Sequence, residues 1–136
     1  MMKHTILILF LFLSLLCHGQ SYKFFTTDRE LSSSLINKIY QDRNGMIWIA
    51  TEDGLNRYDG AKFITYKHDP ENEYSLCHNY VRVLYEDSKG RLFVGTYNGI
   101  QLYDPETDSF SARAQWEDGK TFDSNIMSIL ERRNGE

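Results

Sequence analysis

The sequence predicts an all-β protein made of repeated four-stranded antiparallel sheets, and three observations lead to this prediction. The composition is 14% aromatic and includes nine Gly but only two Pro, which is typical of strands joined by tight turns. The segment 39–60 recurs at 84–105, an offset of 45 residues. Each copy contains two glycine-closed turns, one on either side of an apolar run.

Length and charge narrow the class of protein. A chain of 136 residues with 41% hydrophobic content is suited to one globular domain. The formal net charge of −4 gives no electrostatic basis for binding nucleic acid, which requires clustered Lys and Arg. We expect no nucleic-acid partner and no cofactor.

The first residues have the pattern of an export signal, so residues 1–19 are set apart from the fold. A short positive start precedes Thr5–Leu16, an apolar run that is too short to cross a bilayer. Cys17-His18-Gly19 then places small residues at the positions that favour cleavage before Gln20. Two alternatives stay open, acylation of the cysteine as in a lipoprotein and an uncleaved membrane anchor. We expect a periplasmic protein without a membrane span after cleavage.

The repeat becomes clear when Ile39–Gly60 is placed above Leu84–Pro105 without gaps. A third copy begins at the same offset, with Ile126, Ile129 and Glu131 beneath residues of the second, and the sequence ends at Glu136. The identical pairs include Tyr40/Tyr85, Asp42/Asp87, Gly45/Gly90, Thr51/Thr96, Gly54/Gly99 and Tyr58/Tyr103.

The turns define the strands of each copy. Asp42 and Asp87 begin turns in which a carboxylate accepts backbone N–H groups, and Gly45 and Gly90 supply the positive φ that closes them. The next runs are apolar at nearly every position, which indicates strands covered on both faces. These strands are expected at Met46–Thr51 and Arg91–Thr96, then, after turns that end at Gly54 and Gly99, at Leu55–Asp59 and Ile100–Asp104, with outer strands at Lys62–Lys67 and Ser109–Arg113.

Four short antiparallel strands in each unit of about 45 residues are the signature of a β-propeller blade. We therefore predict a partial β-propeller, with two four-stranded antiparallel blades and the start of a third. Trp48 and Phe93 are expected to fill the space between blades, each burying on the order of 150–250 Å². The predicted segments are a signal peptide (1–19), a lead-in (20–33), blade 1 (34–67), a crossover loop (68–78), blade 2 (79–113), a second crossover loop (114–124) and the start of blade 3 (125–136).

The start of each unit departs from strand periodicity. The pairs Ile36/Ile39, Val81/Leu84 and Ile126/Ile129 are spaced by three residues. A β-bulge, or a strand that starts late, accounts for this spacing. A short helix at the start of each blade is the alternative.

The pattern DxxGxIWIATxxGLxxYDG, from Asp42 to Gly60, resembles the two-component regulator propeller repeat, and Asp87–Asp104 is a looser match with Phe93 in place of Trp. Phe24-Phe25 and Leu31-Ser32-Ser33 are similar to the lead-in of such proteins. The resemblance implies a periplasmic sensor of a hybrid histidine kinase, often responsive to oligosaccharides. It also implies a β-sandwich, a transmembrane helix and a kinase domain, none of which lies in this sequence.

Candidate ligand contacts lie in loops that share one rim of a propeller. The turns after the second strands, Glu52-Asp53 and Tyr97-Asn98, are expected on the same rim as the segment His68–Asn79. Tyr97 with Asn98 is the strongest candidate, because an aromatic face beside an amide suits sugar binding. Glu52 and Asp53 lack the aromatic residue, and ordinary solvated turn residues are the plain alternative throughout.

No residues indicate catalysis or metal binding. His68 and His78 lack metal-ligand spacing, and the recurring Asp residues lie at turns rather than in a calcium-binding loop. Cys77 is the sole cysteine after signal removal, which excludes an intrachain disulfide, and we expect an unreactive, half-buried thiol there.

Three functions remain for this sequence. The first is a fragment of a sensor without enzyme activity; the others are a secreted propeller lectin or adhesin built from several chains, and a shortened propeller enzyme. The repeat pattern favours the sensor. Because two blades alone would leave apolar end faces uncovered, we also expect the chain, expressed alone, to be unstable, to aggregate or to self-associate.

Overall fold

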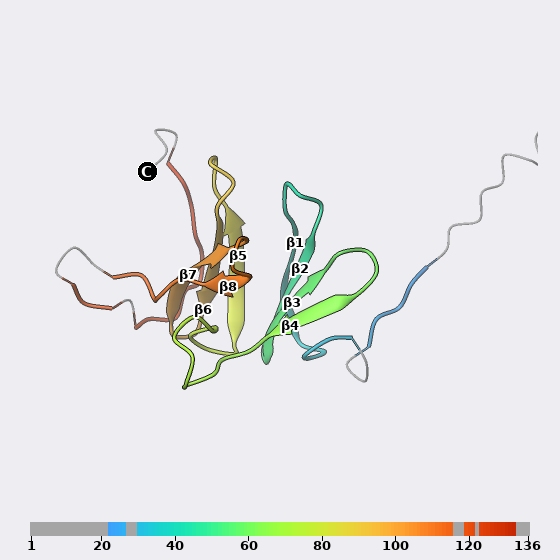
Figure 1. Cartoon of the computed structure of the whole chain (residues 1–136), viewed down its shortest axis with the longest axis horizontal. Coiled ribbons are helices and arrows are strands. Elements are labelled where there is room, and N and C mark those ends of the chain that lie inside the picture. Colours follow the sequence, from blue (N-terminus) through green and yellow to red (C-terminus); the bar gives the residue numbers. More distant parts are fainter. Residues whose placement is uncertain (1–21, 27–29, 116–118, 122, 133–136) are drawn as a thin grey trace, which may run out of the picture.

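The computed structural model describes residues 22–26, 30–115, 119–121 and 123–132 (Figure 1). The predicted signal peptide at 1–19 lies outside the described residues. Within the described part, no helix is long and apolar enough to cross a membrane.

In the described part of the chain, eight strands form two separate four-stranded antiparallel sheets, which stand side by side in Figure 1. Neighbours in each sheet follow chain order, as hairpins joined in a meander require. Blade 1 consists of β1 (Ile36–Gln41), β2 (Ile47–Thr51), β3 (Gly54–Tyr58) and β4 (Phe63–Tyr66), and blade 2 of β5 (Val81–Glu86), β6 (Leu92–Thr96), β7 (Gly99–Asp104) and β8 (Ser109–Phe110).

The predicted all-β class and the four-stranded units are confirmed, and the three-residue spacing is explained by a bulge. The register of β1 against β2 shifts between Ile36 and Lys38, and that of β5 against β6 shifts between Val81 and Val83. The extra residue turns side chains three apart to the same face. The alternative, a short helix at the start of each blade, is wrong.

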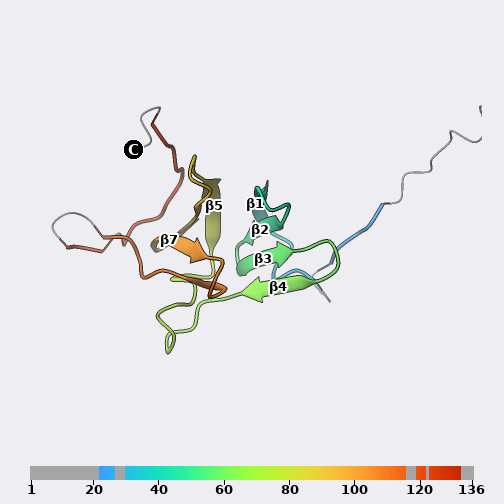
Figure 2. The same ribbon diagram turned by 45° about the horizontal axis from the view of Figure 1, so that its top comes forward.

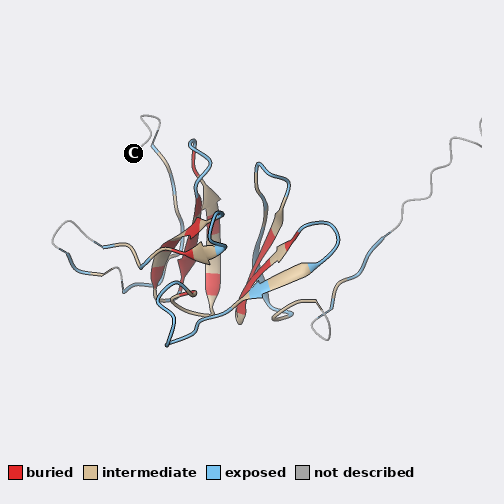
Figure 3. Ribbon diagram, viewed as in Figure 1, coloured by how far each residue is buried: buried red, intermediate tan, exposed pale blue. Residues whose placement is uncertain are grey.

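The middle strands are covered on both faces, as their unbroken apolar sequence predicts (Figure 3). Trp48 of β2 is completely buried, and its ring packs edge-on against Tyr103 of blade 2 at a centroid distance of 4.7 Å. Trp48 therefore fills the space between the blades. Phe93, at the equivalent position of blade 2, is half-buried and lies outside the buried core. The guanidinium carbon of Arg91 lies 5.4 Å from the centroid of its ring.

A polar group closes the outer side of the same interface. Arg57 of β3 forms an ion pair with Asp108 in the β7–β8 turn, at 2.8 Å. The hydroxyl groups of Tyr66 and Tyr103 donate hydrogen bonds to the same carboxylate. Because Arg57 and Tyr66 come from blade 1 while Asp108 and Tyr103 come from blade 2, this group links the two sheets.

The inner strands β1 and β5 lie next to each other in the turned view of Figure 2, where β4 is the outermost strand of blade 1. Glu86 at the end of β5 accepts hydrogen bonds from the Tyr40 hydroxyl (3.0 Å) and from the Arg43 backbone N–H (3.2 Å) of blade 1. Glu131 accepts the equivalent bonds from Tyr85 (3.2 Å) and Ser88 (2.9 Å) of blade 2. One hydrogen-bonding device therefore recurs between successive units.

Residues 123–132 run along the side of blade 2 that faces away from blade 1 (Figure 1). Besides the Glu131 contacts, the Ile126 N–H donates to the Thr96 carbonyl at 3.0 Å, and Ile126 packs closely over Gly95. A Cβ on Gly95 would lie 2.4 Å from Cγ1 of Val83 and 2.8 Å from Cγ2 of Ile126, so glycine at this β6 position lets both side chains approach. Residues 123–132 thus cover part of this face of blade 2, whereas the face of β1 is exposed, with Ile36 44% and Ile39 59% exposed.

Candidate ligand-binding rim

The three predicted rim segments lie together at one end of the blades. The Gly54 N–H, in the β2–β3 turn, donates to the Asn79 carbonyl of the crossover at 2.7 Å. The Tyr97 N–H, in the β6–β7 turn, donates to the Tyr80 carbonyl at the end of the same crossover, at 3.0 Å. The crossover therefore lies between the two turns and joins them into one surface.

A threonine shapes each of these turns in the same way. The Thr51 hydroxyl donates to the Gly54 carbonyl at 2.8 Å and accepts the Asp53 N–H at 3.1 Å. Thr96 makes the equivalent bonds, both at 3.1 Å, to Gly99 and Asn98. Both glycines have positive φ, 134° and 116°, which a residue with a side chain rarely adopts. The two-residue loops that carry the candidate side chains are thus held by the scaffold.

A buried amide in each blade holds the segment that precedes it. Asn56 of β3 accepts the Ser32 N–H at 3.0 Å, and Gln101 of β7 accepts the Cys77 N–H at 2.7 Å. The Ser32 hydroxyl lies 2.9 Å from the Thr51 hydroxyl, and the Cys77 thiol lies 3.2 Å from the Thr96 hydroxyl. Cys77 thus takes the structural place of Ser32. Burial raises the pKa of its thiol, in agreement with the expected unreactive cysteine.

Aromatic side chains gather around Tyr97. Tyr97 is 54% exposed, and its ring lies 5.6 Å from the His78 ring and 6.2 Å from the Tyr80 ring. The Tyr80 hydroxyl donates to Glu52 Oε1 at 2.9 Å, so the group crosses from blade 2 to blade 1. We call Glu52, His78, Tyr80 and Tyr97 the rim cluster.

The four predicted site residues have different surroundings. Tyr97 and Glu52 are connected through Tyr80. Asp53 is occupied by the scaffold, since it pairs with Lys67 at 2.6 Å and accepts a hydrogen bond from Asn79 at 3.1 Å. The side chain of Asn98, half-buried next to Tyr97, makes no hydrogen bond within the described residues.

Sequence reasoning missed Tyr80 and placed His78 among plain loop residues. One signal was available in the repeat: at the offset of 45, Leu35 corresponds to Tyr80 and Ser33 to His78. These positions differ in chemistry while the neighbouring scaffold positions repeat.

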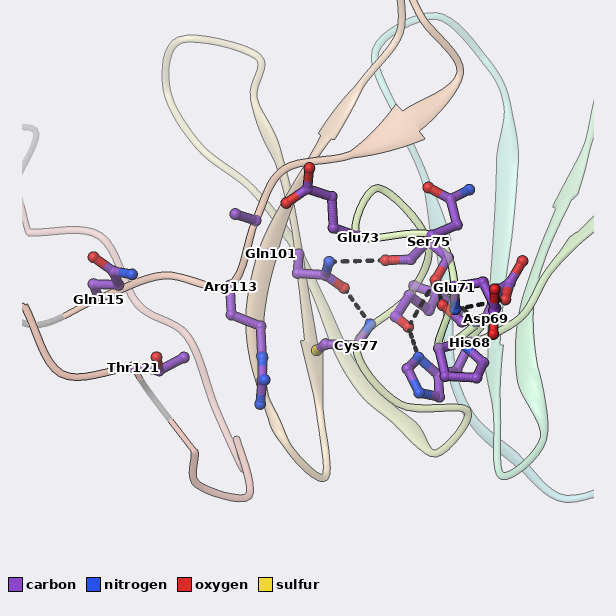
Figure 4. Close-up of a pocket in the computed structure, with 14 residues that line it drawn as sticks. His68, Asp69, Glu71, Glu73, Ser75, Cys77, Gln101, Arg113, Gln115 and Thr121 are labelled. Carbon is purple, nitrogen blue, oxygen red and sulfur yellow. Dashed lines mark hydrogen bonds between the residues drawn. The ribbon is translucent and has the colours of Figure 1, made fainter.

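A separate cavity of about 510 Å³ lies beside the crossover loop, between that loop and the outer part of blade 2 (Figure 4). His68 is tied to the Leu76 carbonyl through Nδ1 at 2.6 Å, and Gln101 bonds to the crossover backbone. Among the described residues, no group of His, Cys, Asp and Glu has the arrangement to hold a metal ion. The polar side chains of this cavity mostly hold the loop itself.

The two component regulator propeller family matches residues 30–53 and 75–98. The two matches begin 75 − 30 = 45 residues apart, and each covers the first two strands of a blade together with its rim turn. Each blade therefore contains one match to the two component regulator propeller family. The predicted resemblance is confirmed, and the rim cluster lies on turns that belong to these propeller repeats.

The histidine kinase P4 of Formosa agariphila is 40% identical over 73 residues, which cover 51% of this chain and 5% of the kinase. The extracellular domain of a hybrid two-component system of B. thetaiotaomicron is 28% identical with a TM-score of 0.69, over 83% of this chain and 16% of that domain. A second such domain from the same organism, 23% identical with a TM-score of 0.59, covers 79% of this chain and 15% of its own length and supports the fold.

The chain therefore corresponds to a small part of each of these three proteins. Its propeller repeats are homologous to extracellular domains of hybrid two-component systems, which agrees with the predicted sensor region.

Proposed function

We propose that this chain is part of the periplasmic ligand-sensing propeller of a two-component signalling protein, and that it has no enzyme activity of its own. Homology to the extracellular domains of hybrid two-component systems supports the signalling role. The export signal predicted at residues 1–19 supports the periplasmic location. In this role the propeller binds a ligand, and a kinase elsewhere in the signalling protein would carry the chemistry.

We further propose that the ligand is an oligosaccharide bound at the rim cluster. The observation that carries this proposal is the exposed Tyr97 ring, flanked by His78 and Tyr80 and connected to Glu52 of the other blade. An aromatic face with a few convergent polar groups is the usual composition of a small-molecule site. Asn98 adds an uncommitted amide beside the ring. Because the site spans two blades, a bound ligand would contact both of them and alter how they pack against each other.

Calorimetric titration of the full chain with a panel of soluble oligosaccharides tests the proposal. Tyr97→Ala is expected to weaken binding about tenfold, because it removes the stacking face. Tyr74→Ala is the matched control: Tyr74 is 56% exposed, against 54% for Tyr97, but lines a separate groove between the blades. Equal affinities of Tyr97→Ala and wild type would remove the rim from consideration.

A further inference from the structure

The 45-residue repeat separates side chains that the scaffold needs from those that it does not. Several scaffold contacts recur in both blades with the same geometry. The glycine-closed rim turns, the glutamate between units and the bonded pairs Ser32/Thr51 and Cys77/Thr96 all follow this rule. Where equivalent positions differ in chemistry and the difference serves no such scaffold contact, the side chain is available for another role.

Differences of this kind converge on one place in blade 2. The blade 1 residues Ser33, Leu35 and Asn37 correspond to His78, Tyr80 and Arg82. Two of the blade 2 residues belong to the rim cluster, and the third contacts it, since the Arg82 guanidinium carbon lies 5.0 Å from the Tyr80 ring centroid. Arg82 therefore extends the rim cluster by one positively charged side chain.

Arg82 is poorly satisfied in comparison with the arginines around it. Its Nη1 donates to the thioether sulfur of Met127 at 2.7 Å, and Nε is buried without a hydrogen-bond partner. In the described part of the chain no carboxylate lies within ion-pair distance of Arg82. Four other arginines do pair with a carboxylate, namely Arg43, Arg57, Arg91 and Arg113.

This arrangement favours an anion over the contacts that Arg82 makes at present. A thioether is a weak acceptor, whereas a carboxylate or sulfate accepts charge-assisted hydrogen bonds from the planar guanidinium, often two at once. A buried donor that lacks a partner also costs stability until one is supplied. Met127 is 68% exposed and lies in a segment without regular secondary structure, so an incoming anion can displace its side chain.

We propose that Arg82 binds the carboxylate or sulfate of an acidic sugar, so that the ligand of the rim cluster is an acidic oligosaccharide. This inference rests on the proposed function, because a neighbouring sugar must stack on Tyr97. The orientation follows from the charges. The Arg82 guanidinium lies over the Tyr80 ring, and Glu52 accepts a hydrogen bond from the Tyr80 hydroxyl. The acidic group of the ligand therefore lies on the Arg82 side of Tyr80, away from the Glu52 carboxylate.

Calorimetric titrations with a galacturonic acid oligosaccharide and with its methyl ester test this inference, because esterification removes the carboxylate charge and adds only a methyl group. The acid form is expected to bind the full chain about tenfold more tightly than the ester. Added salt should reduce this preference, since the contact between charges is screened. A sulfated galacto-oligosaccharide, titrated in parallel, distinguishes sulfate from carboxylate as the preferred group.

Variants assign the preference to the residue. Arg82→Gln should abolish the difference in affinity between acid and ester. Arg82→Lys should keep part of this difference, because lysine retains the positive charge but cannot donate the two parallel hydrogen bonds of a guanidinium. Arg132→Gln is the control, because Arg132 is exposed and lies away from the rim. At the offset of 45 it corresponds to Asp87, in the β5–β6 turn at the end of the blade opposite the rim. Circular dichroism confirms that each variant is folded.

The outcomes separate the two proposals. Equal affinities for acid and ester, unchanged by Arg82→Gln, would overturn the acidic preference and leave the rim site in place. An acid preference that persists in Arg82→Gln would also overturn the role of Arg82. Absence of binding by every oligosaccharide, neutral or acidic, would overturn the proposed function and this inference together.

Discussion

The indole nitrogen of Trp48 donates a hydrogen bond to Oδ2 of Asp42 at 2.8 Å, which joins the main side chain between the blades to the first turn. In blade 2, Phe93 has no such donor. There Arg91 supplies the contact, with Nε and Nη2 both 2.6 Å from Oδ2 of Asp87. The two blades thus satisfy the equivalent carboxylate oxygen with donors from different positions. In blade 1 the donor is residue 48, whereas in blade 2 it is residue 91, which corresponds to residue 46 of blade 1.

This difference predicts a compensating pair of substitutions. Trp48→Phe should destabilise the chain by about 2–4 kcal/mol, from lost packing and an unpaired carboxylate oxygen. Adding Met46→Arg, which reproduces blade 2, should recover about 1 kcal/mol, because the guanidinium again contacts Asp42. Urea unfolding of the two single variants and the double variant measures the coupling. If the changes in unfolding free energy of the two single variants simply add up in the double variant, the Trp48–Asp42 and Arg91–Asp87 contacts are not equivalent.

Glu86→Gln tests the hydrogen-bonding device between the units. The Glu86 side chain is only 4% exposed and accepts bonds from Tyr40 and from the backbone of Arg43. Its amide analogue keeps the size but loses the charge, so we expect a loss of about 1–2 kcal/mol in unfolding free energy. The control is Glu106→Gln, in an exposed turn, which should change little. A loss of similar size in both variants would contradict a specific role for Glu86.

The group around Asp108 predicts a pH dependence of stability. Burial alone would raise the pKa of this carboxyl, but hydrogen bonds from Tyr66 and Tyr103 and the charge of Arg57 lower it on balance. A folded pKa below the unfolded value of about 3.9 stabilises the fold above that pH, and the contribution is lost as pH falls through the folded pKa. Stability should therefore decline below about pH 4.

Asp108→Asn isolates this contribution, because Asp108 has φ of 52° and Asn tolerates the left-handed region. The variant should be less stable than wild type at neutral pH, and the difference should shrink at pH values below about 4. Unfolding in urea at several pH values gives both curves. Parallel curves across the acid range would show that Asp108 does not act through its charge.

The exposed face of β1 predicts self-association of the chain after signal removal. Ile36 and Ile39 correspond to Val81 and Leu84, which are 0% and 3% exposed because they pack against blade 1. Sedimentation should show a molecular mass that rises with concentration, and Ile39→Lys should reduce this association. Leu130→Lys is the control, since Leu130 is 87% exposed and lies outside β1. A monodisperse wild-type monomer that unfolds cooperatively would contradict the prediction.

Much of the fold was accessible from the sequence because blade chemistry is local. Asp42, Gly45 and Gly54 act within a few residues of their own positions, so turns and strands follow from the order of residue types. The spacing of Ile36 and Ile39 left a bulge and a helix open, because a single extra residue changes the facing of a strand without any marker in composition.

The site was less accessible because its contacts join distant residues. Glu52 and Tyr97 were named, but Tyr80, which connects them, lies at the end of the crossover, and only the register of β5 against blade 1 brings it between the two turns. The contact of Arg82 with Met127 depends in the same way on how residues 123–132 dock on blade 2. Comparison of equivalent repeat positions is the sequence signal that would have pointed to these residues.

A crystal structure of the full chain with a bound oligosaccharide tests the central claim most directly. We expect the sugar to lie against the Tyr97 ring, within hydrogen-bond distance of Glu52 or Asn98, with the two blades packed through Trp48. A sugar held only in the cavity beside the crossover loop, or blades that do not meet through Trp48, would contradict the account.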